Sequence, residues 1–403
     1  MSEDSLRRKI LKEKAKDLLD RLMSALPSSV RSQIEPMVEK RDVQGLIEWA
    51  KMSLGVTDDI MGMMFERAMS AVESLLESIP INIIVHTRAY SHSKIARDIN
   101  RVIKGTVISY SDEVDTYRSN VIVVSTIDYI DIALSSRFII PADEAVYYGT
   151  AEGIPVLTSL SKDVLEGCRV VVPSNFVKNM VSKAGVRVDG VVYHSVGDNE
   201  YDPIKSAMIR KRILEKTKCR KLVGWIGANQ YRKGIDIAFK VAEYLPRDVA
   251  TVIISGYGEV SVPEKYDLPR NIVFLDRVFR IKNVFNFYKA FDVFLSTSRS
   301  EGFGLPVAEA FSIGKPVVIP RISVFEELFP DDLVYFYEAS STPKYTLYKN
   351  YMWMHYQEPD PSDAAEMVMK ALNDDKSKEV RRIDYARSKF SLSNYRQLTN
   401  TFR

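Results

Sequence analysis

The chain contains 403 residues, enough for two or three domains with large hydrophobic cores. Apolar residues make up 46% and charged residues 27%, which excludes a disordered or collagen-like chain, and no run of about 18 apolar residues predicts a membrane-spanning helix. A net charge of +3 argues against a nucleic-acid partner, and two cysteines without CxxC spacing argue against a disulfide framework or zinc cluster, so we expect a cytoplasmic protein.

Residues 1–80 are predicted to form a helical extension. Apolar residues recur at helical spacing from residue 5 to 78, and Pro27 and Pro36 punctuate the run. Residues 7–16 contain six basic residues and one acidic residue. We favour a solvated helix that packs on the next domain, and peripheral membrane contact through these helices is the alternative.

Residues 81–197 are predicted to form an N-terminal Rossmann-like domain. Short apolar, β-branched runs alternate there with polar or helical stretches, as in a mainly parallel sheet covered by helices. The expected strands are 81–85, 106–109, 121–125, 137–140, 154–157, 169–172 and 190–193.

Residues 198–385 repeat this plan as a C-terminal Rossmann-like domain. A helix at 204–216 leads into strands near 221–226, 250–255, 271–275, 292–297 and 315–319, with helices at 234–244 and 305–313. Residues 386–403 are expected to form a C-terminal helix, with a crossing back to the N-terminal lobe as one option. For the aromatic insert at 340–358 we favour packing on a helix or subunit over sugar stacking or a lipid interface.

The loop after strand 292–297 carries the strongest functional signal. Gly302 and Gly304 allow the backbone to approach a ligand closely, and a helix with Pro306 in its first turn starts at Leu305. Unpaired N–H groups at such a helix start suit an anion such as a diphosphate. Glu301 and Glu309 flank this point, and carboxylates accept hydrogen bonds from sugar or ribose hydroxyls.

Three further loops follow predicted strands at the same edge of the sheet. Gly227 begins the loop that carries Arg232 and Lys233, which are fixed positive charges suited to a leaving diphosphate. Gly256 and Val278 follow two other strands and are expected to wall a nucleotide, Val278 through main-chain contacts to the base.

The stretch 301–309, EGFGLPVAE, with the following residues 310–318, resembles the donor-site signature of retaining GT-B glycosyltransferases of family 4, the glycosyl transferases group 1. Further similar segments span roughly residues 170–340. They are Lys233-Gly234, Gly256-Tyr257-Gly258, the strand 271–275, Glu326, and the segments 173–177 and 194–198.

This resemblance implies an α/β protein of GT-B fold, in which two Rossmann-like, doubly wound domains face a cleft. It makes residues 81–197 the acceptor domain and residues 198–385 the nucleotide-sugar donor domain. It implies a retaining hexosyltransferase that uses a UDP- or GDP-type sugar, with no cofactor, no metal, and a glycan, lipid or protein acceptor. Glu301 would contact the donor sugar, and Glu309 would hold the ribose. Arg232 and Lys233 would stabilise the diphosphate, while the backbone of Gly302, Phe303, Gly304 and Leu305 would lie near the sugar and phosphate.

The sequence departs from the family pattern at several positions. Ala228 stands where an arginine is common in the family, and we expect Arg232 to supply the missing positive charge. The segment 85–92 stands where the family has a glycine-pair loop. Its His86, Arg88 and His92 are candidates for contact with the acceptor, and a structural role is the alternative for the histidines. The alternative functions are a nucleotide-sugar epimerase or hydrolase, or a catalytically silent nucleotide-binding scaffold.

Overall fold

The computed structural model describes residues 28–39, 45, 48–49, 52–53, 81–87, 89–112, 119–140, 142, 144–197, 199–256, 260–261, 268–275 and 283–400. The chain divides into two compact units, residues 1–81 with 113–118 and residues 82–112 with 119–403, and each is described by itself. In the first unit, helix α2 (Ser28–Glu39) contains Pro36, which therefore does not end the helix as expected. The basic segment 7–16 lies outside the described residues.

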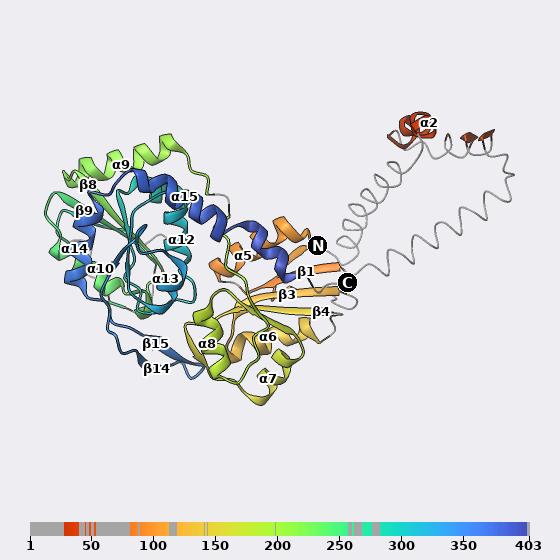
Figure 1. Cartoon of the computed structure of the whole chain (residues 1–403), viewed down its shortest axis with the longest axis horizontal. Coiled ribbons are helices and arrows are strands. Elements are labelled where there is room, and N and C mark those ends of the chain that lie inside the picture. Colours follow the sequence, from red (N-terminus) through yellow and green to blue (C-terminus); the bar gives the residue numbers. More distant parts are fainter. Residues whose placement is uncertain are drawn as a thin grey trace. The chain divides into compact units, whose positions relative to one another are not determined.

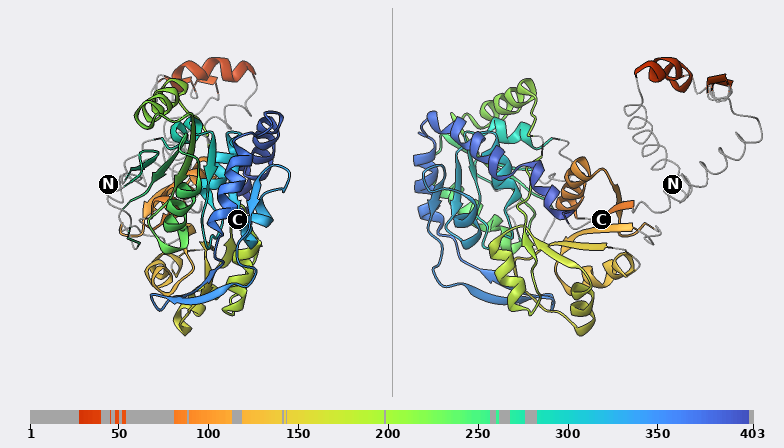
Figure 2. Two further views of the ribbon diagram at one scale, coloured as in Figure 1. Left: turned by 90° about the vertical axis from the view of Figure 1, so that its left-hand side faces the viewer. Right: turned by 45° about the vertical axis from the view of Figure 1, so that its right-hand side comes forward.

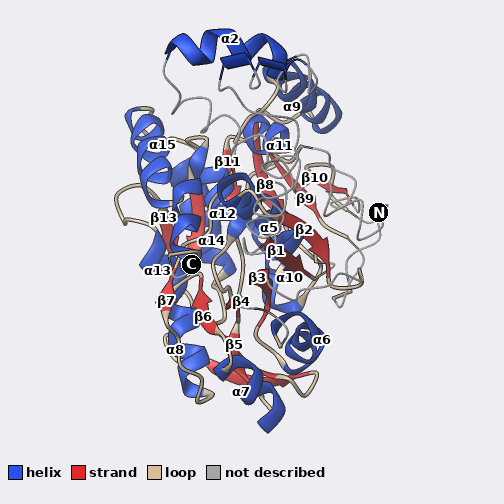
Figure 3. Ribbon diagram, turned by 90° about the vertical axis from the view of Figure 1, so that its right-hand side faces the viewer, coloured by secondary structure: helices blue, strands red, loops and turns tan. Residues whose placement is uncertain are grey.

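The second unit contains two parallel sheets, each flanked by helices (Figure 1, Figure 3). The first sheet has the order β2-β1-β3-β4-β6-β7. Its central strand β3 is buried along almost its whole length, as expected when helices cover both faces. The strands are β1 (Ile81–His86), β2 (Thr106–Ser109), β3 (Ser119–Thr126), β4 (Glu144–Thr150), β6 (Arg169–Val172) and β7 (Gly190–Val191).

Among the described residues, four helices accompany this sheet and form the first lobe with it. Helix α5 packs on β2 and β3, and α6 and α7 pack together against β3 and β6. The helices are α5 (Tyr90–Ile103), α6 (Tyr129–Ile139), α7 (Ser159–Glu166) and α8 (Asn175–Lys183).

One strand prediction in this lobe is wrong, and another is confirmed only in part. Residues 137–140 end helix α6, where Phe138 and Ile139 are buried, and the strand is β4 instead. A short apolar run does not distinguish a buried strand from a buried helix segment. Residues 153–155 do form a strand, β5 (Gly153–Pro155), but it lies outside the parallel sheet.

The second sheet has the order β10-β9-β8-β11-β12-β13 and forms the second lobe with its helices. Helices α10 and α14 pack on one face of the sheet, and α9, α11 and α12 pack on the other. The strands are β8 (Lys221–Ile226), β9 (Val249–Ile254), β10 (Ile272–Leu275), β11 (Val293–Leu295), β12 (Val317–Pro320) and β13 (Tyr335–Tyr337). The helices are α9 (Pro203–Thr217), α10 (Ile235–Tyr244), α11 (Phe285–Ala290), α12 (Leu305–Ser312), α13 (Ser323–Leu328) and α14 (Pro361–Ala371).

The C-terminal segment runs from the second lobe to the first (Figure 1). Helix α15 (Ser377–Lys389) packs on α12, and the following 3₁₀ helix η3 (Leu392–Leu398) packs on α5. Tyr395 and Leu398 are fully buried in the first lobe's core, and the Tyr395 hydroxyl accepts a hydrogen bond from the Ser195 N–H at 3.0 Å. The last part of the chain therefore joins the two lobes.

The aromatic insert also joins the lobes and forms a β-hairpin (Figure 2). The expected packing on a helix is confirmed, because the His355 ring of this hairpin lies edge-on against Phe176 of α8 with centroids 5.3 Å apart. Strands β14 (Lys344–Tyr348) and β15 (Met352–Tyr356) pair with each other, and β15 pairs antiparallel with β5 of the first lobe. A Cβ on Gly153 would lie 2.0 Å from the Trp353 carbonyl oxygen, so the absent side chain lets these two backbones meet.

Candidate active site

A cavity of about 480 Å³ lies between the two lobes at the carboxyl ends of their strands. Helix α5 contributes to one wall, and the loops after β8 and β11 and the start of α12 form the opposite wall. In open α/β sheets this edge is where ligands bind. Its volume falls in the range typical of small-molecule sites, about 300–1,000 Å³.

The turn before α12 is shaped by two glycines. Gly304 has φ of +86° at the N-cap of α12, a conformation that other residues rarely adopt. A Cβ on Gly302 would lie 2.2 Å from Thr150 Oγ1, so only glycine permits the approach to the first lobe. Leu305 and Pro306 line the cavity, which places the positive end of the α12 dipole at its wall.

A buried charge cluster lies beside this turn. Lys233 Nζ is 2.6 Å from Glu301 Oε1, and the Ser298 hydroxyl donates to the same oxygen at 2.7 Å. Arg232 Nη1 lies 3.7 Å from Glu301 Oε2 and 3.3 Å from Glu152 Oε1. Two cations and two carboxylates from both lobes therefore meet at one end of the cavity.

These neighbours set the ionisation of the cluster. Burial alone would raise the pKa of Glu301, but Lys233 and Arg232 outweigh it, so the pKa lies below its usual value and the carboxylate is ionised. Burial and the Arg232 charge lower the pKa of Lys233, against the opposing effect of Glu301. An anion that entered beside Lys233 would favour its charged form.

Glu309 faces the cavity from within α12 and is buried. The Tyr288 hydroxyl donates to Glu309 Oε2 at 3.0 Å, and Lys94 Nζ of the first lobe lies 3.5 Å from Oε1. Burial raises the pKa of Glu309, and Lys94 and Tyr288 only partly offset that rise. Glu309 thus holds an ion pair across the cleft in this structure.

His194 is a cavity residue for which we predicted no role. Its Nδ1 lies 2.7 Å from the Tyr148 hydroxyl, and its ring packs edge-on against Phe303 with centroids 4.9 Å apart. Burial, with smaller contributions from His92 and Lys94, lowers the pKa of His194 to about 3. The ring is therefore neutral at physiological pH.

The structure brings most of the predicted site residues to this cavity. Those in its wall are Arg232, Lys233, Gly227, Glu301, Gly302, Phe303, Gly304, Leu305, Glu309 and His92.

The other four predicted residues are not among its described lining residues. Gly256 is buried after the end of β9, and the His86 ring Nδ1 lies 2.6 Å from the Thr87 carbonyl oxygen. Val278 and Arg88 lie outside the described residues.

Sequence reasoning missed Lys94, Glu152, His194 and Tyr288. Lys94 follows the candidate His92 by two residues, and His194 begins a segment that resembles the family, so a weak signal existed for both. Glu152 and Tyr288 stand in no motif.

Comparisons with known proteins match these observations. Residues 209–389 match the family model Glycosyl transferases group 1. The chain is 24% identical over 189 residues to Uncharacterized glycosyltransferase 335 of Sulfolobus islandicus rod-shaped virus 1, which covers 45% of this chain and 56% of the relative. It is 30% identical over 145 residues to the O-antigen biosynthesis glycosyltransferase WclY of Escherichia coli, covering 34% and 39%. The chain thus spans about half or less of the length of these relatives.

Solved structures show the same fold over more of the chain. The crystal structure of Anabaena Alr3699/HepE in complex with UDP aligns with a TM-score of 0.59 and 14% identity, covering 80% of this chain and 99% of that one. In the described part of the chain, no helix combines the length and the apolar character needed to cross a bilayer. The chain has the GT-B fold with two Rossmann-like lobes, and its residues 209–389 are similar to the Glycosyl transferases group 1 family.

Proposed function

We propose that the chain is a retaining glycosyltransferase that moves a hexosyl unit from a UDP- or GDP-type sugar to an acceptor hydroxyl. One observation carries this proposal: the Arg232–Lys233 pair and the start of α12 lie in one cavity with Glu301 and Glu309. A nucleoside diphosphate sugar has a doubly charged diphosphate between two polyols. The cations and helix start suit the diphosphate, and the carboxylates suit the polyols.

Each cavity residue has a role in this proposal. Arg232 and Lys233 balance the charge that develops on the departing diphosphate, a form of help that often dominates transfer chemistry. Glu301 accepts hydrogen bonds from the donor sugar, and Glu309 accepts them from the ribose once Lys94 moves away from it. The complex of Anabaena Alr3699/HepE with UDP-glucose supports a nucleotide-sugar ligand for this fold.

The transfer exchanges one carbon–oxygen bond for another. The bond between the anomeric carbon and the diphosphate oxygen breaks, and its electron pair stays on the diphosphate. The acceptor oxygen forms the new bond on the same face of the sugar, and its proton passes to the departing diphosphate oxygen. Closure of the lobes would exclude water, which otherwise takes the acceptor's place.

We further propose that this chemistry needs neither a metal nor a cofactor, because Arg232 and Lys233 supply the positive charge at the diphosphate. Assays with EDTA and with added Mg²⁺ test this point. Equal rates are expected, and a strict requirement for Mg²⁺ would contradict it.

Product analysis with donor alone and with donor plus an acceptor panel tests the function itself. A transferase forms a glycoside only when the acceptor is present. An epimerase or hydrolase turns over the donor alone, and a silent scaffold binds nucleotide without forming any product.

We propose that the protein acts in the cytoplasm. Liposome sedimentation of the chain with and without residues 1–80 tests peripheral membrane contact, and equal sedimentation would exclude a role of these residues in it.

A further inference from the structure

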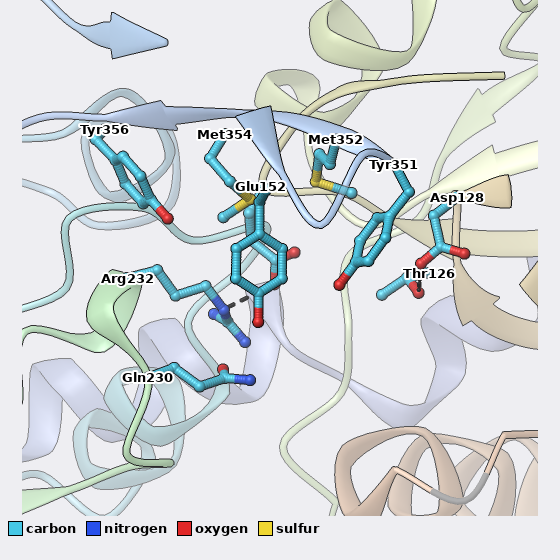
Figure 4. Close-up of a pocket in the computed structure, with 10 residues that line it drawn as sticks. Thr126, Asp128, Glu152, Gln230, Arg232, Tyr351, Met352, Met354 and Tyr356 are labelled. Atoms are coloured by element: carbon cyan, nitrogen blue, oxygen red, sulfur yellow. Dashed lines mark hydrogen bonds and ion pairs between the residues drawn. The ribbon is translucent and has the colours of Figure 1, made fainter. Parts of the chain in front are cut away.

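A second cavity, of about 130 Å³, lies between the β14–β15 hairpin and the first lobe (Figure 4). The hairpin forms one wall, and the carboxyl ends of β3 and β4 with the loop after β8 form the rest. Its lining residues are Thr126, Asp128, Glu152, Gln230, Arg232, Tyr348, Tyr351, Met352, Met354 and Tyr356.

The hairpin presents an amphipathic wall to this cavity. Met352, Met354 and Tyr356 alternate along β15 and so share one face, and the thioethers of the two methionines are buried. The hydroxyl ends of Tyr351 and Tyr356 point inward from opposite sides (Figure 4). Burial, followed by Tyr348 and Asp128, raises the pKa of Tyr351, so its hydroxyl stays protonated and is able to donate.

Acceptors of hydrogen bonds line the opposite wall. The buried Oε1 of Gln230 accepts no hydrogen bond from any residue that the structure describes. Asp128 is buried, and the Thr126 hydroxyl donates to its Oδ2 at 2.9 Å. Polar groups buried in this way are normally satisfied, which indicates a ligand with hydroxyl donors at Gln230.

The second cavity adjoins the donor cavity. Glu152, Gln230 and Arg232 line both of them, and the contact of 3.3 Å between Arg232 Nη1 and Glu152 Oε1 lies in the shared wall. A ligand in the second cavity would therefore sit beside the cations that we assign to the donor diphosphate.

We propose that the second cavity binds one uncharged pyranose ring of a carbohydrate acceptor. Its volume is slightly below the roughly 150 Å³ of a cavity that admits a single benzene ring, so a pyranose with its hydroxyl groups would extend into the adjoining donor cavity. Methionine and tyrosine side chains suit the apolar face of a sugar, while Asp128, Glu152 and Gln230 suit its hydroxyls. Asp128 and Glu152 outnumber Arg232 in the wall, and Glu152 already pairs with Arg232, so the net negative charge disfavours a phosphorylated or carboxylated sugar. The assignment of this ligand as an acceptor rests on the proposed transferase function. If the acceptor binds here, the β14–β15 hairpin is the element that selects it.

Saturation-transfer NMR with the methyl glycosides of glucose, mannose and galactose, in the presence of saturating UDP or GDP, tests this site. We expect at least one glycoside to bind together with the nucleotide. Met352→Trp, which fills the cavity, should abolish that signal, and Tyr351→Phe should raise the glycoside Kd about three- to tenfold through loss of one hydrogen bond.

Tyr345→Phe is the matched control, because Tyr345 pairs with His355 on the other face of the hairpin and should bind the glycoside as the unchanged chain does. Displacement of every glycoside by the nucleotide, or equal binding by Tyr351→Phe and the unchanged chain, would overturn the inference. A chain that binds UDP or GDP but no glycoside removes the inference alone. A chain that binds neither nucleotide removes the proposed function with it.

Discussion

The Lys233 ammonium lies 2.6 Å from Glu301 Oε1 and ties the loop after β8 to the loop after β11. Both side chains are largely withdrawn from solvent, with 13% and 6% of their surfaces exposed. Removal of one partner of a buried pair leaves an uncompensated charge and strongly lowers stability. The loss of an exposed pair changes stability little. A diphosphate bound in the cavity would give Lys233 a second anionic partner beside Glu301.

Glu301→Gln should lower kcat about a hundredfold and change the donor Kd far less, because the carboxylate orients the sugar during transfer rather than holding the nucleotide. Steady-state kinetics and calorimetry separate the two effects. Glu366→Gln, on the exposed face of α14, is the control and should behave as the unchanged chain does. A loss confined to donor affinity would contradict the assigned role.

Glu309→Ala should weaken nucleotide binding about ten- to a hundredfold, because hydrogen bonds from the ribose to a charged acceptor are lost. Calorimetric titration of UDP and GDP measures this change. Glu326→Ala on α13, whose carboxylate pairs with Arg321 near the surface, should leave the affinity unchanged. Equal nucleotide affinities for both variants would place the ribose elsewhere.

Gly304→Ala should lower the free energy of unfolding by about 2 kcal/mol or more, because a residue with a Cβ is strained at φ of +86°. The new Cβ would also lie 2.4 Å from Phe325 Cε1. Gly167→Ala is the control, since its φ is −73° and the nearest atom lies 3.5 Å away. Urea unfolding should show almost no change for that control, and equal losses for the two variants would count against strain at Gly304.

Stability should depend on pH through His194. Its pKa falls from 6.5 to about 3 on folding, so the unfolded chain binds more protons between these values. The folded state should lose up to about 1.4 kcal/mol per pH unit as pH falls through this window, and this group should contribute no change above it. His194→Gln should flatten that part of the pH profile in urea unfolding. Parallel profiles for the two proteins would show that His194 is not buried in its neutral form.

Much of the second lobe was predictable because its signals are local. The run 221–226 coincides with β8, and the predicted helices at 234–244 and 305–313 match α10 and α12 within one residue at each end. In the first lobe, the tyrosine-containing β4 was missed, and the apolar residues 137–140 were assigned to a strand although they end α6.

Pairing between distant segments left no local signal. Strand β5 meets β15 through contacts such as Gly153 with Met354, which are about half the chain apart. The hairpin 344–356 therefore appeared in the sequence only as an aromatic cluster, and its contact with the first lobe depended on the three-dimensional fold.

The same contrast applies to the site. Glu301, Glu309, Arg232 and Lys233 stand in short motifs next to glycines, so the sequence indicated them. Glu152 reaches the cluster from the first lobe, and Tyr288 reaches Glu309 from α11, through packing that no spacing predicts.

Calorimetric titration of the whole chain with UDP and GDP tests the central claim most directly. We predict that at least one nucleotide binds at a single site, with an affinity that falls in Glu309→Ala and is retained in Glu326→Ala. Absence of binding by both nucleotides, or binding that Glu309→Ala leaves unchanged, would contradict the assignment of this cavity to a nucleotide sugar.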